Sequence, residues 1–244
     1  MIIAFSNQKG GVNKTTLTFN VGYLLAEAGK NVLVVDADPQ SSLTTIFNVD
    51  SKQNITDVLL NNESIDKVII QIENNLALVP AGIELANFEV NVATKKGREY
   101  YFKDILEPIK DQYDYILIDS PPSLGLLLIN ILNASDRVII PTQTDYLSYK
   151  GLDLLLHTVA KVKETFNREL KVSGVVATAH DGRTLHSREI LELMEGLNVL
   201  AVITNSVKVK DATLASLPLH KYDSKHKVVA EYKKIVRSVL NDGK

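Results

Sequence analysis

The segment that most constrains this chain is a glycine-rich turn, Lys9-Gly10-Gly11-Val12-Asn13-Lys14-Thr15-Thr16, between a short apolar strand and an apolar-periodic helix. The pattern predicts the strand over 2–5 and the helix over 17–28. Backbone N–H groups in such a turn point inward, and the helix dipole favours an anion at the same place. The sequence therefore predicts a phosphate-binding loop, in which Lys14 neutralises phosphate charge and the Thr15 hydroxyl is available to Mg²⁺.

The turn departs from the common GxxxxGK[ST] pattern. Gln8 and Asn13 stand where that pattern has glycines, and Lys9 adds a second lysine. Asn is one of the residues that best tolerate the left-handed backbone that glycine supplies at such a position. Two interpretations of Asn13 stay open: a neutral substitution, or a side chain beside the phosphates that slows turnover.

Two carboxylate segments follow apolar strands. Asp36-Ala37-Asp38-Pro39-Gln40 comes at the end of an expected strand over 32–36, and Asp119 ends an expected strand over 115–119. Ligands of doubly wound sheets bind beyond the carboxyl ends of the strands, where these groups are expected to lie. Both segments are therefore candidates for the same site as the turn.

With Lys9 at its start, the turn resembles the deviant Walker A motif, KGGxGK[ST][ST], of the ParA/MinD superfamily of P-loop ATPases. The segment 36–40 resembles the family's first switch, and 113–125 resembles its Walker B strand and second switch. Further similarity, at 97–100, 141–148 and 181–184, extends over nearly the full chain. The similarity is greatest to the short, Soj-like ParA proteins.

The resemblance implies ATP and Mg²⁺ as cofactors and an ATP-dependent homodimer in which Lys9 reaches the partner's nucleotide. It implies that Asp38 positions the attacking water and that Thr15 and Asp119 serve Mg²⁺. Adenine contact is implied for Asn205 or Ser206, with the choice between them open. The nucleotide-binding residues are then Lys9, Gly10, Gly11, Val12, Asn13, Lys14, Thr15, Thr16, Asn205 and Ser206.

Apolar runs that alternate with helical patterns predict an α/β fold, a doubly wound and mostly parallel sheet with helices on both faces, in one domain over 1–244. Strands are expected over 2–5, 32–36, 77–80, 115–119, 137–141, 172–178 and 199–203. Helices are expected near 17–28, 55–60, 101–109, 125–134, 151–166, 187–197 and 228–240, with Gly29 ending the first.

The net charge of −2 hides a polarised chain. Residues 1–148 carry 11 Lys and Arg against 18 Asp and Glu, and residues 149–244 carry 16 against 11. Lys208 and Lys210 alternate with valines, so an extended backbone would place both on one face, as contacts to DNA phosphates require. Lys227 and Lys234 follow, although a solvated helix surface is the plainer interpretation of any single lysine.

The chain has no cysteine, which excludes disulfides, thiolate metal sites and iron–sulfur clusters. We expect no signal peptide and no membrane span, because the first residues predict a strand and no apolar run is long enough. The resemblance implies a cytoplasmic, nucleoid-associated DNA-partitioning ATPase that binds non-specific DNA and is stimulated by a ParB-like centromere-binding protein.

Two alternatives remain from the sequence. A MinD-like membrane-positioning ATPase would use an amphipathic helix over 228–240, which lacks Trp and Phe. A metabolic P-loop enzyme, similar to dethiobiotin synthetase, is disfavoured by Lys9 and by the segment 36–40.

Overall fold

A computed structural model describes residues 1–194 and 196–242. Its centre is an eight-stranded sheet in the order β3-β4-β2-β5-β1-β6-β7-β8. All neighbouring strands are parallel except β3 and β4, which run antiparallel. The strands are β1 Ile2–Phe5, β2 Val32–Asp36, β3 Ile70–Glu73, β4 Leu76–Val79, β5 Tyr115–Asp119, β6 Arg137–Gln143, β7 Lys171–His180 and β8 Val199–Thr204.

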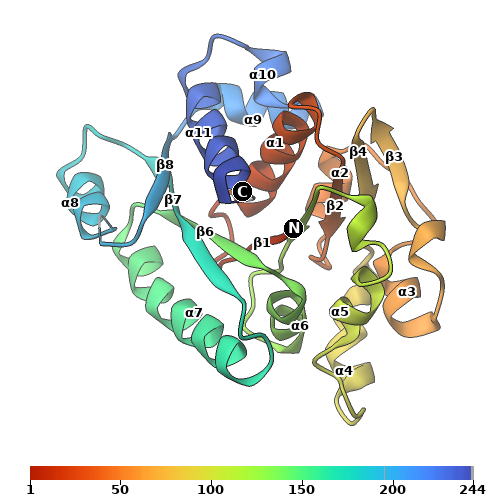
Figure 1. The fold of residues 1–244 in the computed structure, drawn as a ribbon. Coiled ribbons are helices and arrows are strands. Elements are labelled where there is room, and N and C mark those ends of the chain that lie inside the picture. The colour runs from red at the N-terminus through yellow and green to blue at the C-terminus, as the bar shows by residue number, and fades with distance from the viewer. Residues whose placement is uncertain (195, 243–244) are drawn as a thin grey trace.

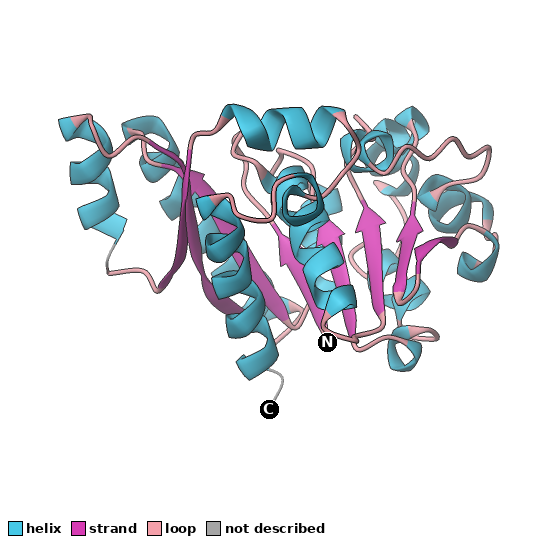
Figure 2. Cartoon of the chain, turned by 90° about the horizontal axis from the view of Figure 1, so that it is seen from above, coloured by secondary structure: helices cyan, strands magenta, loops and turns pink. Residues whose placement is uncertain are grey.

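Helices cover both faces of this sheet (Figures 1 and 2). The α-helices are α1 Lys14–Glu27, α2 Ser42–Ile46, α3 Ile55–Asn61, α4 Phe88–Val92, α5 Tyr101–Leu106, α6 Leu126–Ala134, α7 Tyr146–Thr165, α8 Leu185–Met194, α9 Val207–Leu214, α10 Leu219–Tyr222 and α11 Lys227–Asp242. Short 3₁₀ helices are η1 Ile65–Lys67, η2 Ile83–Asn87 and η3 Lys110–Gln112. The predicted doubly wound α/β fold is therefore confirmed.

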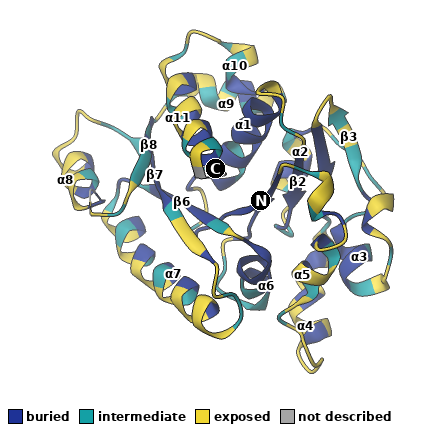
Figure 3. Ribbon diagram, viewed as in Figure 1, coloured by how far each residue is buried: buried dark blue, intermediate teal, exposed yellow. Residues whose placement is uncertain are grey.

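The alternation of side chains along each strand divides the core into two layers. Ile2 and Ala4 of β1 belong to a buried layer shared with α3 to α8. Ile3 and Phe5 belong to the layer on the other face, which is shared with α1, α2, α9, α10 and α11. Every residue of β1 is buried, and Figure 3 shows the central strands in the buried colour between exposed helix surfaces. Burial on both faces explains why these strands are continuous apolar runs in the sequence.

The structure contains several elements that the sequence did not predict, among them the short helices α2, α4 and α10. Strand β3 was not predicted: it is a short edge strand that pairs with β4 across a turn at Asn75, whose φ is 63°. The extended backbone that would place Lys208 and Lys210 on one face is not observed, because both residues lie in helix α9. Residues two positions apart in an α-helix are separated by about 200° around its axis, so the two lysines do not share a face.

Within residues 1–194 and 196–242, none of the helices combines the length and apolar character that crossing a lipid bilayer requires.

Candidate nucleotide-binding site

The glycine-rich turn joins the end of β1 to the start of α1, as the sequence predicts. Gly11 and Asn13 both adopt left-handed backbone conformations, with φ of 75° and 66°. Asn13 is the N-cap of α1, and its carbonyl accepts a hydrogen bond of 3.0 Å from Leu17 N. A Cβ built on Gly10 or Gly11 would meet no atom within 4 Å. Asn13 thus takes the backbone conformation expected of glycine, and open space adjoins the turn.

Side chains of β6 and β7 donate hydrogen bonds to backbone carbonyls of the glycine-rich turn. Gln143 Nε2 donates to the Gly11 carbonyl at 2.8 Å, and Thr178 Oγ1 donates to the Val12 carbonyl at 3.1 Å. Sequence reasoning gave neither Gln143 nor Thr178 a role at the turn. The available signal was their place at the carboxyl ends of expected parallel strands, where side chains converge.

Lys14 is a buried cation at the first position of α1. Burial lowers the pKa of its ammonium group, and the nearby carboxylates of Asp119 and Asp38 counteract that shift. Its Nζ donates to the Lys9 carbonyl at 3.4 Å, which is a long hydrogen bond. A desolvated ammonium beside a helix N-terminus favours a bound anion.

Asp119 ends β5 between β1 and β2, in register with Phe5 and Asp36. It is fully buried, and neither carboxylate oxygen has a hydrogen-bond partner of normal geometry among the described residues. Burial, followed by the charge of Asp36, raises its pKa well above the usual value, against smaller effects of Thr15 and Lys14. An unpaired buried carboxylate is costly, so this position suits a bound cation.

The donor set fits Mg²⁺ rather than a metal held by the protein alone. The Thr15 hydroxyl lies near enough to Asp119 to lower its pKa. The described residues contain no group of three or more His, Asp or Glu side chains placed to hold a metal. Mg²⁺ is typically held by one or two carboxylates and completes its shell with water and phosphate oxygens. Thr15 and Asp119 therefore suit a magnesium–nucleotide complex.

The two carboxylates that follow β2 have different environments. Asp36 is buried and accepts hydrogen bonds from the backbone N and hydroxyl of Thr44, each 2.8 Å, and from Asp38 N at 3.1 Å. Burial raises its pKa to about 6. Asp38 is half-buried, and its charge acts on both Lys14 and Asp119. Asp36 therefore orders the loop, and Asp38 is the carboxylate available at the phosphate site.

Lys9 is engaged within its own chain. Its Nζ lies 3.1 and 3.0 Å from the two carboxylate oxygens of Asp145 and 2.8 Å from Ser148 Oγ. Asp145 is also the N-cap of α7, where it accepts from Ser148 N at 3.0 Å. The side chain of Lys9 is 36 % exposed and that of Asp145 32 %, so the pair can open to solvent without breaking the core.

A cavity of about 680 Å³ lies beyond the ends of β7 and β8. Asn205 and Ser206, the two residues predicted to contact adenine, both line it. Thr204, which sequence reasoning missed, is a further residue of this lining, although its Oγ1 is buried and has no hydrogen-bond partner among the described residues. Ser206 Oγ lies 3.1 Å from His226 Nε2.

The four lysines predicted to contact DNA do not form one stripe. Lys208 Nζ lies 5.6 Å from the ring centroid of Tyr222 in α10. Lys210 and Lys227 line the 680 Å³ cavity instead. Lys234 pairs with Glu231 at 2.8 Å on the exposed side of α11. Of these, Lys208 does not line the cavity and forms no ion pair with the residues that the structure describes.

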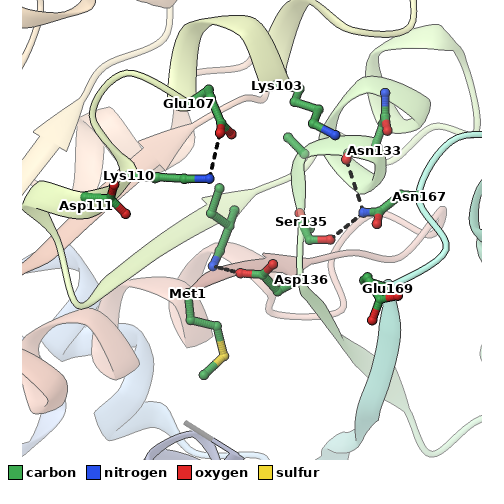
Figure 4. A pocket seen from close by; sticks show the side chains of 12 residues that line it. Met1, Lys103, Glu107, Lys110, Asp111, Asn133, Ser135, Asp136, Asn167 and Glu169 are labelled. Carbon is green, nitrogen blue, oxygen red and sulfur yellow. Dashed lines mark hydrogen bonds and ion pairs between the residues drawn. The ribbon is translucent and has the colours of Figure 1, made fainter.

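A second cavity, of about 340 Å³, lies at the amino ends of β1 and β6, the opposite edge of the sheet from the turn (Figure 4). Figure 4 shows Asn167 donating to the carbonyls of Asn133 and Ser135 at the end of α6. Glu107 and Lys110 form an ion pair of 2.7 Å in its wall. The hydrogen bonds of Asn167 satisfy backbone carbonyls at the end of α6, so we assign this cavity a structural role.

Comparison with known proteins gives consistent results. A family model described as an AAA domain matches residues 1–172. The chromosome-partitioning ATPase Soj of Treponema pallidum is 38% identical over 243 residues, covering 98% of this chain and 96% of that protein. The sporulation initiation inhibitor protein Soj of Bacillus subtilis is 39% identical, with 99% of both chains covered.

Solved structures with similar folds contain nucleotides. A putative plasmid partition protein of Borrelia burgdorferi bound to AMPPNP has a TM-score of 0.88 and 28% identity, covering 99% of this chain and 98% of that one. A cobyrinic acid a,c-diamide synthase of Mycobacterium smegmatis with ADP and magnesium has a TM-score of 0.83 and 33% identity, with 98% and 93% covered.

Proposed function

The chain belongs to the Soj and ParA family of P-loop partitioning ATPases, and from that membership we propose that it segregates DNA by an ATP-driven switch. ATP with Mg²⁺ closes two subunits into a dimer, and the dimer binds DNA without sequence preference. A ParB-like centromere-binding protein then stimulates hydrolysis and release. Residues 1–244 act as one ATPase domain, a proposal supported by the joining of all eight described strands in one sheet.

The observation that carries the proposal is the pairing of a buried cation with a buried, unpartnered carboxylate at the glycine-rich turn. Lys14 offers charge for phosphate, and Thr15 and Asp119 offer oxygens for Mg²⁺. Burial disfavours the charged forms of Lys14 and Asp119, and a ligand of opposite charge at each offsets that cost. The nucleotide and magnesium found in similar structures support the same ligand here.

Dimer formation is supported by the surface next to Lys9. Helix α7 begins beside the Lys9–Asp145 pair, and it exposes Tyr146, Leu147 and Leu154, which are 53%, 72% and 52% accessible. Large exposed apolar side chains near a charged site are typical of an interaction surface. We propose that α7 contacts the second subunit and that Lys9 leaves Asp145 to reach the partner's nucleotide.

The membrane-positioning alternative is not favoured. It requires the apolar side of α11 to face lipid. In the structure that side is buried against the sheet and α1, with Val229, Tyr232, Ile235 and Val239 each at most 3% exposed. A metabolic enzyme is the other alternative that the experiment below tests, because one similar structure is named a cobyrinic acid a,c-diamide synthase.

The deciding experiment measures ATP binding by calorimetry with Mg²⁺, and then co-sedimentation with plasmid DNA or anionic liposomes, each with and without ATP. We expect ATP binding that Lys14→Ala abolishes and Lys30→Ala preserves, since Lys30 is a partly exposed lysine at the far end of α1. ATP-dependent pelleting with DNA supports partitioning. Pelleting with liposomes supports membrane positioning, and ATP binding without either supports a metabolic enzyme.

A further inference from the structure

Helix α6 lacks a capping side chain of its own. Its N-cap residue is Gly125, which has no side chain to accept from the first free backbone N–H groups. Glu89, a residue of α4, replaces it: Glu89 Oε1 accepts a hydrogen bond of 3.2 Å from Leu127 N. A carboxylate at this place is favoured by the helix dipole as well as by the hydrogen bond.

The contact explains why position 125 is a glycine. A Cβ built on Gly125 would collide with the Glu89 carboxylate and lie 2.8 Å from Glu89 Cδ. The backbone itself makes no such demand, because φ of −77° and ψ of −169° are open to any residue. The glycine therefore makes room for the carboxylate of another helix.

This contact fixes the far end of the loop that follows Asp119. The loop covers residues 120–125, and at its near end Ser120 N donates to the Phe5 carbonyl at 3.2 Å. Glu89 holds the other end. Helix α4 is itself anchored, because Phe88 and Val92 are buried in the core and the Phe88 ring packs edge-on against Tyr101.

We propose that Glu89 is a positioning residue for ATP hydrolysis, which sets the course of the 120–125 loop by capping α6 from α4. The proposal rests on the proposed function, since it concerns the ATPase reaction at Asp119. Loss of the cap frees the far end of the loop, and a shift of the groups beside Asp119 and the phosphates reduces the rate of a reaction that depends on their alignment. Glu89 touches neither nucleotide nor metal in this assignment.

The first test compares single-turnover ATP hydrolysis and nucleotide affinity in Glu89→Ala, Glu89→Gln and the parent chain. We expect Glu89→Ala to lower the rate about tenfold, which is less than the roughly hundredfold cost that a misplacement of about 1 Å can carry. Its ATP affinity stays unchanged. Glu89→Gln keeps an acceptor oxygen and retains most of the rate. Glu84→Gln is the matched control, because Glu84 is an exposed acid in η2 that makes no hydrogen bond or ion pair with the described residues.

The second test is a double-mutant cycle with Gly125→Ala, which displaces the Glu89 carboxylate without straining the backbone. We expect Gly125→Ala to be as slow as Glu89→Ala, and the double variant to be no slower than either. If Glu89→Ala does not fold, the hydrolysis rates and ATP affinities of Gly125→Ala and Glu89→Gln test the proposal. Rates equal to the parent in the folded variants, or equal losses of rate and ATP affinity, overturn the proposal.

A parent chain that hydrolyses no ATP with DNA and partner present contradicts the proposed function instead. A parent chain that is active while Glu89→Ala is equally active contradicts only the role of Glu89.

Discussion

Lys9 Nζ lies 3.0 Å from a carboxylate oxygen of Asp145, so the lysine expected to act on a second subunit is neutralised inside its own. Exposed ion pairs of this kind contribute up to about 1 kcal/mol. The pair is therefore weak enough to exchange for a phosphate group and strong enough to bias the resting chain. We infer that ATP-dependent dimerisation competes with this contact.

Asp145→Asn tests the competition. The substitution keeps an acceptor for Ser148 N, so α7 stays capped, while the charge that holds Lys9 is lost. We expect a tighter ATP-dependent dimer, by up to about fivefold in dissociation constant, which corresponds to about 1 kcal/mol. Lys9→Ala should bind ATP and remain monomeric. Light scattering with and without ATP measures the mass of both variants. An ATP-dependent dimer of Lys9→Ala would falsify the proposal that Lys9 acts on the nucleotide of the second subunit.

Asp38→Ala and Asp119→Ala should separate hydrolysis from metal binding. Asp38 is half-buried, and its Oδ1 accepts a hydrogen bond of 2.9 Å from Gln40 N. If it orients the attacking water as proposed, its loss should leave ATP binding intact and prolong residence on DNA. Asp119 is buried and has no hydrogen-bond partner of normal geometry among the described residues, so its loss should abolish Mg²⁺-dependent nucleotide binding. Calorimetry with and without Mg²⁺ distinguishes them. Two variants that both fail to bind nucleotide would remove the difference in roles.

Asn13→Gly tests whether the departure from glycine slows turnover. Asn13 holds the required φ of 66°, so nucleotide binding needs no glycine. Its side chain replaces a hydrogen atom beside the phosphates, and we expect its removal to raise the hydrolysis rate about tenfold, or about 1.4 kcal/mol in barrier height. The measurement is the steady-state rate at saturating ATP and partner. Equal rates in the two proteins mean that Asn13 is a neutral substitution.

Lys208→Glu and Lys210→Glu should have different effects, because the helix points these side chains apart. Lys208 lies over Tyr222 and is available to DNA, so its reversal should weaken binding to all sequences alike and reduce the salt dependence. Lys210 lines the 680 Å³ cavity in which Asn205 and Ser206 are proposed to contact adenine, so its reversal should change ATP affinity as well. DNA titrations at several salt concentrations, with parallel calorimetry, report both. Identical behaviour of the two variants would contradict the assignment.

The buried Asp36 predicts how stability depends on pH. Its pKa rises from 3.8 to about 6 on folding, so the folded chain binds the proton more tightly than the unfolded chain. Stability should then fall as pH rises from 3.8 to about 6, by up to about 3 kcal/mol in the free energy of unfolding. The pKa of Asp119 is also raised by burial, so this residue too makes the folded chain less stable as pH rises. Urea unfolding across this pH range should show a smaller slope for Asp36→Asn.

Much of the fold was predictable because its strands are buried on both faces. The continuous apolar run at 115–119 and the strand at 2–5 predicted β5 and β1 with the observed bounds. Strand β3 was missed because an edge strand of four residues alternates between half-buried and exposed positions and carries little apolar signal. Helix α9 was not predicted, because the alternation of valine and lysine over 207–210 suits an extended backbone as well as a helix, and Ala212 is its one buried residue among those described.

The site was predictable where a motif carries the chemistry in adjacent residues. Lys14 and Thr15 follow directly from the turn, and Asp119 from the end of a strand. The partners of Lys9 and the capping contact of Glu89 were not predictable, since each joins residues that are far apart in the chain. Such contacts depend on helix placement, which the spacing of apolar residues leaves open.

The support behind the glycine-rich turn has a kinetic consequence. Gln143 and Thr178 hold the carbonyls of Gly11 and Val12, which fixes the orientation of these peptide planes before nucleotide arrives. The turn then has little conformational entropy left to lose on binding. ATP should therefore associate as with a rigid, charged receptor, fast and strongly slowed by salt. Slow steps seen in stopped-flow traces would then report the rearrangement of subunits rather than the closing of the turn around phosphate.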